Sequence, residues 1–241
     1  MASTTLQYRD GDVSLKGVLV GSEMRTAGPA IVLFPDARGV GAHAIECAGR
    51  LAGLGYPTLV ADLYGEGLLA RDMTQAGELM RGLRADVDRW RTRARVALEA
   101  LSLQDGVDRS RLAALGYCFG GSTALELARS GARLAAVVSF HGGLASPRPA
   151  DAANIKAKVV LVCHGAADPL VPPAEVAAFK EEMGWTKVDW QLHAYGGAVH
   201  AFTNPEADSG GIPAFAYNEA ADRRSWAAMR ALLQEAFPSG S

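Results

Sequence analysis

The chain has 241 residues, of which 49% are hydrophobic, and its formal net charge at pH 7 is -2. A chain of this length can bury a large core without disulfides or metal ions, so we expect one domain over residues 1–241. Because acidic and basic residues nearly balance, the composition excludes the basic footprint that is typical of nucleic-acid binding.

The first ten residues are polar and charged, and no window approaches the roughly 18 consecutive apolar residues that span a bilayer. Three cysteines, Cys47, Cys118 and Cys163, are too few and odd in number for a disulfide framework. Together these features predict a cytoplasmic protein with neither a membrane nor a nucleic acid among its partners.

Two β-like runs at residues 4–9 and 13–20 lie on either side of a turn and predict a hairpin. Residues 30–34 are continuously apolar, which is typical of a strand buried on both faces. In chain order there follow a helix at 42–54, a strand at 56–62 and a long charged amphipathic stretch at 76–103, as one helix or two. Then come a strand at 111–116, a helix at 120–129, strands at 134–140 and 158–163, a helix at 173–183, a strand at 187–193 and a helix at 217–237.

The alternation of strands and helices predicts an α/β fold with a mostly parallel central sheet, helices on both faces and an N-terminal antiparallel hairpin. The charged run at 81–95 is expected to be a solvated helix face, and residues 145–153 a surface loop. Ligands of such sheets bind at the carboxyl ends of the strands, so the residues after each strand are the candidate site.

After the strand at 111–116 comes the pattern G-x-C-x-G, centred on Cys118 and followed by a helix. This is the spacing of a nucleophile elbow with cysteine in place of serine. The N-terminus of the helix favours a thiolate at Cys118 and directs the backbone N–H of Phe119 toward an oxyanion. Taken alone, the pattern is equally compatible with a buried cysteine in a glycine-rich turn.

Two further strands end near an acid and a base. Asp168 follows the strand at 158–163, and His200 follows the strand at 187–193. The order nucleophile, acid, histidine is that of α/β-hydrolases, so we expect His200 to exchange the proton of Cys118 and Asp168 to orient His200. His164 is expected to be structural and His141 to be a pocket wall. The histidines and cysteines lack metal-ligand spacing, so neither a metal nor another cofactor is predicted.

The loop after the strand at 30–34 is the usual source of a second oxyanion N–H, for which Ala37 is the candidate. Asp36 is then expected at the rim of the site, with a plain turn role as the alternative. Tyr64, at the end of the strand at 56–62, is expected to line the pocket, with a packing role as the alternative.

These residues carry a family resemblance that extends over nearly the whole chain. The matching segments are GYCFGG at 116–121, ADLY at 61–64, HGAADPLVP at 164–172, YGGAVHAF at 195–202 and AYNEAADRRSW at 216–226. In them the chain resembles the dienelactone hydrolase family, a cysteine branch of the α/β-hydrolases. The resemblance implies one α/β-hydrolase domain, a catalytic set of Cys118, His200 and Asp168, and cofactor-free hydrolysis of esters or lactones.

The chain departs from the prototypes of that family at three places. They have a glutamate where Asp36 stands, an arginine where Asn204 stands, and another arginine near Gly65 and Glu66. Without the two arginines the pocket lacks a clamp for a substrate carboxylate, so a small neutral ester or lactone is the predicted substrate. The pocket candidates are Asp36, Arg38, Tyr64, His141, Phe202 and Asn204.

Two other functions remain open. The same three residues suit a thioesterase or acyltransferase, because water and other nucleophiles attack the same acyl-thioenzyme. A non-catalytic protein that binds a ligand or responds to oxidation of Cys118 is the alternative from a different class. The sequence leaves the choice between monomer and dimer open.

Overall fold

The computed structural model of the protein describes residues 2–21 and 27–238. Within them, an 8-stranded sheet runs in the order β1-β2-β4-β3-β5-β6-β7-β8. The strands are β1 (Ser3–Asp10), β2 (Val13–Val20), β3 (Gly28–Phe34), β4 (Thr58–Val60), β5 (Val107–Tyr117), β6 (Ala136–Phe140), β7 (Val159–Gly165) and β8 (Asp189–Tyr195).

The hairpin β1–β2 is antiparallel, and β2 joins the sheet antiparallel to β4. From β4 through β3, β5, β6 and β7 to β8 all neighbours are parallel. The predicted fold class is therefore confirmed. Because the strands of this part run the same way, their carboxyl ends meet along one edge.

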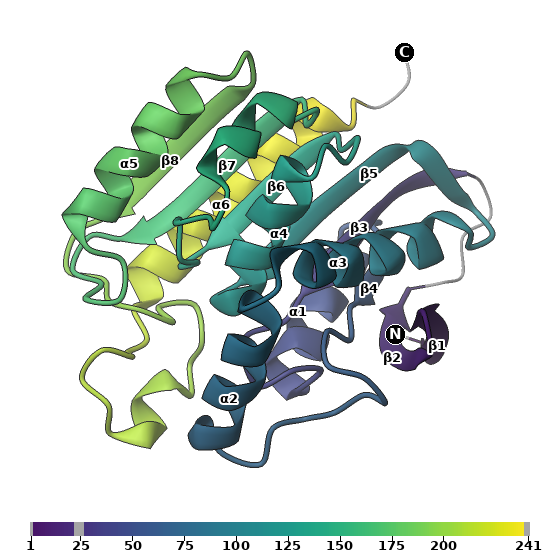
Figure 1. Ribbon diagram of the computed structural model, residues 1–241, viewed down its shortest axis with the longest axis horizontal. Coiled ribbons are helices and arrows are strands. Elements are labelled where there is room, and N and C mark those ends of the chain that lie inside the picture. Colours follow the sequence, from purple (N-terminus) through teal and green to yellow (C-terminus); the bar gives the residue numbers. More distant parts are fainter. Residues whose placement is uncertain (1, 22–26, 239–241) are drawn as a thin grey trace.

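Helices cover both faces of the sheet, as Figure 1 shows. Side chains from α2 (Met73–Arg84), α3 (Val87–Ser102), α4 (Phe119–Arg129) and α5 (Pro173–Gly184) form one core cluster. Side chains from α1 (Ala42–Gly53) and α6 (Glu219–Ala236) form the other. β3 is buried on both faces from Ala30 to Phe34, as its continuous apolar run predicts.

The long amphipathic stretch at 76–103 is two helices, α2 and α3. Asp72 and Asp86 cap them by accepting hydrogen bonds from the backbone N–H groups of Gln75 and Arg89. A capping aspartate satisfies an N–H group that has no partner inside the helix, so Asp86 marks the start of a second helix.

The prediction that the charged run at 81–95 is a solvated face is wrong for two of its members. Arg91 and Arg93 are 5% and 6% exposed. Arg91 pairs with Glu126 and Asp151, and Arg93 pairs with Asp10. Burial of these cations is tolerated because each has an acidic partner from another element, which the local sequence does not reveal.

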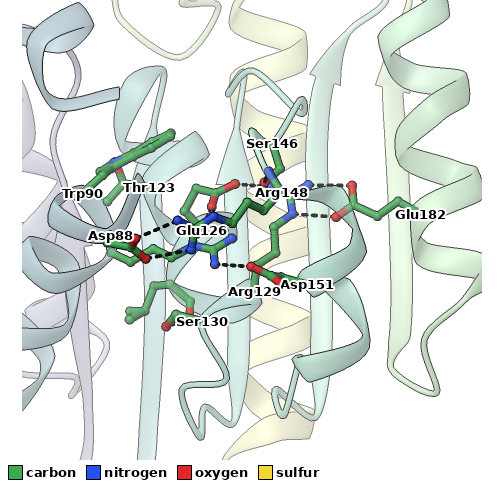
Figure 2. A network of polar contacts seen from close by, with 12 residues as sticks. Asp88, Trp90, Thr123, Glu126, Arg129, Ser130, Ser146, Arg148, Asp151 and Glu182 are labelled. Atoms are coloured by element: carbon green, nitrogen blue, oxygen red, sulfur yellow. Dashed lines mark hydrogen bonds and ion pairs between the residues drawn. The ribbon is translucent and has the colours of Figure 1, made fainter. Parts of the chain in front are cut away.

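A buried polar network links α3, α4 and α5, as Figure 2 shows. The guanidinium of Arg129 in α4 donates to Glu126 on its own helix and, with two nitrogens, to Glu182 of α5. Arg129 also donates to the carbonyl of Leu144. The network thereby holds the segment that follows β6.

That segment contains the expected surface loop at 145–153, and most of its described residues are exposed. Residues Pro149–Asn154 form the short 3-10 helix η1, and Ala152 is fully buried against α4. A second short 3-10 helix, η2 (Ala207–Gly210), lies between β8 and α6. No helix of the described part of the chain is long and apolar enough to cross a membrane.

Candidate active site

Three strand ends bring three side chains together at one edge of the sheet. Cys118 follows β5, Asp168 follows β7 and His200 follows β8. Nε2 of His200 lies 3.0 Å from Sγ of Cys118, and Nδ1 of His200 lies 2.7 Å from Oδ2 of Asp168. The three predicted residues therefore form one hydrogen-bonded chain.

The backbone of Cys118 is strained. Its φ of 54° and ψ of -119° lie where residues with a side chain rarely occur, and the residue is the N-cap of α4. A Cβ atom on Gly116 would lie 2.0 Å from the carbonyl oxygen of Gly120. A Cβ atom on Gly120 would lie 2.0 Å from the carbonyl oxygen of Phe34. Both glycines are therefore required for β3, β5 and α4 to pack this closely.

The pKa of His200 depends on the charges of its neighbours. Burial lowers the pKa of His200, but attraction to the Cys118 thiolate and the hydrogen bond to Asp168 outweigh it and raise that pKa to about 10. By contrast, burial raises the pKa of Cys47 to about 11 and that of Cys163 to about 12. Those two cysteines are buried free thiols, whereas Cys118 is partly exposed beside a base.

Two backbone N–H groups flank Cys118. That of Phe119 is the first of α4, where N–H groups have no partner inside the helix. That of Ala37 lies in the loop after β3, and within residues 2–21 and 27–238 neither group donates to a backbone carbonyl. The hydroxyl of Tyr64 donates at 2.9 Å to the carbonyl of Ala37, which belongs to the next peptide along the chain, and so anchors the loop at this residue. Ala37 and Phe119 therefore remain candidates for the oxyanion hole.

Two cavities meet at Cys118. One has a volume of about 180 Å³ and the other of about 300 Å³. Both are lined by Ala37, Met73, Cys118 and Phe215, and His200 lines the larger one.

The structure decides where the predicted pocket residues lie. Asp36, Arg38, His141 and Asn204 line the smaller cavity. Tyr64 and Phe202 line neither cavity, contrary to expectation. Phe202 is fully buried with its ring 5.1 Å from that of His141, because it packs into the core cluster that α1 and α6 share.

Asp36 also makes the turn contact that was its alternative role. Its Oδ1 accepts from the backbone N–H of Arg38 at 2.8 Å, while the residue still lines the smaller cavity. His164, which is expected to be structural, is buried, and its Nδ1 has no hydrogen-bond partner among the described residues.

Sequence reasoning missed several lining residues because they follow no strand. His43 comes from α1, and Ile212 and Phe215 come from the segment before α6. Met73, Gly77, Met80 and Arg84 line the larger cavity from α2. The sequence signal for the four residues of α2 is their helical spacing, since positions three or four apart share a helix face. No group of three or more metal-ligating side chains occurs in the described part.

Comparison with known proteins agrees with the geometry. The dienelactone hydrolase family matches residues 15–237. The chain belongs to the dienelactone hydrolase family. It is therefore a member of a family of ester and lactone hydrolases, as its motifs predict.

Relatives within the family span several organisms. A putative carboxymethylenebutenolidase of Yersinia pestis is 27% identical over 72% of this chain and 68% of its own length. An uncharacterized protein of Caenorhabditis elegans is 37% identical over 60% of this chain and 92% of its own length. A similar protein of known crystal structure is a dienelactone hydrolase-like promiscuous phosphotriesterase from metagenomic libraries. Its sequence is 45% identical to this chain, and the two structures superpose over 98% of both chains with a TM-score of 0.94.

The positions at which the sequence predicts a departure from the family are Asn204, Gly65 and Glu66. Asn204 lines the smaller cavity, and neither Gly65 nor Glu66 lines either of the two cavities at Cys118. Arg71 has an exposed side chain and lines neither of these two cavities. Arg38 lines the smaller cavity.

Proposed function

We propose that this chain hydrolyses neutral carboxylic esters or lactones through a thioester on Cys118. The observation that carries the proposal is the hydrogen-bonded chain of Cys118, His200 and Asp168 where two cavities meet. A nucleophile hydrogen-bonded to a base, with the base oriented by a third group, is the arrangement that covalent acyl transfer requires.

In the first half of the reaction the Cys118 sulfur attacks the ester carbonyl carbon, and the carbonyl π electrons move to oxygen. The N–H groups of Ala37 and Phe119 stabilise the resulting oxyanion. When the tetrahedral intermediate collapses, the C–O bond to the alcohol breaks and the imidazolium of His200 protonates the departing oxygen. The product of this half is the alcohol and an acyl group on Cys118.

In the second half, neutral His200 removes a proton from water as the water oxygen attacks the thioester carbon. Collapse of the second tetrahedral intermediate breaks the C–S bond and releases the carboxylic acid. The sulfur departs as thiolate beside the imidazolium of His200, which restores the starting state. Throughout, Asp168 holds Nδ1 of His200, 2.7 Å away, and offsets the positive charge of the ring.

The charges in the smaller cavity support a neutral substrate. Among the described residues that line it, Asp36 and Glu206 are acidic and Arg38 is basic. A single exposed guanidinium beside two carboxylates is a poor site for a substrate carboxylate, which binds best to paired donors. The larger cavity is lined by Met73, Met80, Leu170, Val171 and Phe215, which favours an apolar group on one side of the ester.

Hydrolysis of phosphotriesters is a second candidate activity. It is supported by the relative that is named a promiscuous phosphotriesterase and is 45% identical over 98% of both chains. Attack of Cys118 on phosphorus would expel an alkoxide or aryloxide, and water would then break the S–P bond. An acyltransferase or thioesterase on the same residues differs only in the nucleophile or the leaving group.

Kinetics with p-nitrophenyl butyrate and with paraoxon test the proposal. We expect turnover of the butyrate ester by the wild-type protein, none by Cys118→Ala, and a 1:1 acyl adduct on Cys118 by mass spectrometry. Added hydroxylamine or a second thiol would separate hydrolysis from acyl transfer by its products. Equal rates for the wild-type protein and Cys118→Ala with both substrates would refute the proposed function.

A further inference from the structure

His141 connects the backbone of Cys118 to the loop that bears His200. It follows β6, and its Nδ1 accepts a hydrogen bond from the backbone N–H of Cys118 at 3.1 Å. The same N–H also donates to the carbonyl of Phe140 at 2.9 Å. The strained residue therefore has its N–H held by two acceptors, of which one is a side chain.

The other ring nitrogen of His141 reaches the opposite side of the site. Its Nε2 lies 2.8 Å from Oγ1 of Thr203, which is three residues beyond His200 in the chain. Because Nδ1 accepts from Cys118, the proton of the neutral ring is on Nε2 and is donated to Thr203. His141 and Thr203 are 2% and 5% exposed, so water does not compete for these bonds.

We propose that His141 is a positioning residue that sets the distance between the sulfur of Cys118 and the imidazole of His200. The proposal rests on the proposed function, in which these two groups react as a pair. It goes beyond that function because it assigns a role to His141. One of its hydrogen bonds holds the segment of Cys118, and the other holds the segment of His200.

The strain at Cys118 gives this role its physical reason. A residue with φ of 54° and ψ of -119° keeps that conformation only when its surroundings hold it. The ring of His141 also packs edge-on against the ring of His200, with centroids 5.3 Å apart. Loss of His141 would therefore release the elbow backbone and free the His200 ring to turn away from the sulfur.

The role requires a neutral ring, and the surroundings provide it. Burial lowers the pKa of His141 well below its ordinary value, and the nearby His200 and His43 lower it further. Tyr117, with a ring centroid 5.9 Å away, and Cys118 also lie beside it, and the carbonyl of Cys163 accepts from its backbone N–H at 2.8 Å. A proton on Nδ1 would remove the acceptor that the N–H of Cys118 uses.

Three substitutions of His141 separate hydrogen bonding from bulk. His141→Asn places an amide oxygen near the position of Nδ1, and asparagine tolerates the φ of 41° that this residue has. His141→Gln places its amide near Nε2, and His141→Leu has neither the acceptor of Nδ1 nor the donor of Nε2. Thr203→Val removes the second bond without altering position 141, and Thr203→Ser restores a hydroxyl.

The measurement is the rate at which iodoacetamide alkylates Cys118 between pH 5 and pH 9, followed on the Cys118 peptide by mass spectrometry. The same variants are assayed with p-nitrophenyl butyrate, and their melting temperatures are recorded. We expect His141→Leu and His141→Gln to lower kcat by at least about tenfold with little change in KM, since misplacing reacting atoms costs that much or more. Their alkylation profile should move toward the higher pH of an unpaired thiol.

We expect His141→Asn to restore most of the rate and the wild-type alkylation profile, and Thr203→Val to show a weaker form of the leucine effect that Thr203→Ser reverses. An unchanged alkylation profile in both His141→Leu and Thr203→Val, with normal melting temperatures, would overturn the proposal. Because alkylation does not depend on turnover, this result is distinguishable from failure of the proposed hydrolase activity.

Discussion

Nε2 of His200 lies 3.0 Å from Sγ of Cys118, although 82 residues separate the two in the chain. At this distance an imidazolium and a thiolate stabilise each other, and Asp168 stabilises the imidazolium from the other side. The ionisation of His200 is consequently part of the stability of the fold as well as of the proposed chemistry.

The free energy of unfolding should therefore depend on pH through His200. Its pKa is raised from 6.5 to about 10 in the folded protein, although burial opposes the change. The added stability is then fully present below pH 6.5 and is lost as the pH rises through about 10.

Cys118→Ala removes the thiolate, so the pKa of His200 should fall and the loss of stability at high pH should shrink. Urea unfolding of both proteins at pH 6, 8 and 10 measures this, because linkage predicts a steeper decline for the wild type. Parallel curves for the two proteins would show that the thiolate does not raise the pKa of His200.

The glycines of the elbow should tolerate no side chain. Gly120→Ala places its Cβ atom 2.0 Å from the carbonyl oxygen of Phe34, where only backbone movement gives room. We expect a loss of about 3 kcal/mol or more in the free energy of unfolding, at the upper end of overpacking effects.

Gly49→Ala is the matched control, since a Cβ atom at this position in α1 meets nothing within 4 Å. It should raise the stability by about 0.5–1 kcal/mol, because alanine is the better helix former. Thermal and urea unfolding of the two variants should thus give changes of opposite sign.

Arg129 should be the most sensitive member of the polar network. Arg129→Met leaves Glu182 without its bidentate partner and the Leu144 carbonyl without its side-chain donor. Removal of one partner of a buried ion pair costs about 3–5 kcal/mol, and we expect a loss of that size by urea unfolding.

Arg148→Ala provides the comparison. Arg148 also makes two hydrogen bonds to one carboxylate, that of Asp88, but both side chains are largely exposed. Its loss should therefore change the stability by less than about 1 kcal/mol. Similar losses for the two arginine variants would contradict the assignment of the stabilisation to burial.

Asn204→Arg should change the choice of substrate. The new guanidinium would enter the smaller cavity near Asp36 and Arg38 and provide a second donor for a substrate carboxylate. We expect kcat/KM for a carboxylate-bearing ester to rise by about tenfold relative to its neutral amide analogue, the effect of one charge-assisted contact.

Asn204→Met separates the effect of the new charge from loss of the asparagine amide. It removes the amide and adds a long side chain that has no charge. It should leave the preference for the neutral ester unchanged. A rise in the preference for the anionic ester in both variants would show that the asparagine, and not the missing arginine, sets the specificity.

Much of the fold follows from local patterns. The continuous apolar run of β3 and the alternation of strands with amphipathic helices predict a parallel sheet, because a strand buried on both faces needs helices above and below it. The boundaries of some elements differ from those predicted: β5 begins at Val107, four residues before its predicted start, and α6 begins after its Asn218 cap.

The buried arginines show what local patterns miss. The sequence predicts that Arg91 of α3 is part of a solvated charged face. In the structure it pairs instead with Glu126 of α4 and Asp151 of η1. These residues lie far apart in the sequence. A charged side chain leaves water only when it finds partners of opposite charge, and here tertiary packing supplies them.

For the candidate site the division is similar. The chain by itself determined the elbow glycines and the order of Cys118, Asp168 and His200, because that chemistry requires a tight turn and each residue follows a strand. Tertiary structure alone decided that His141 joins Cys118 to Thr203 and that Tyr64 bonds the Ala37 carbonyl and lines neither of the two cavities at Cys118. It also decided that α2 and the segment before α6 line the cavities, because such contacts depend on how distant elements pack over the sheet and carry no motif of their own.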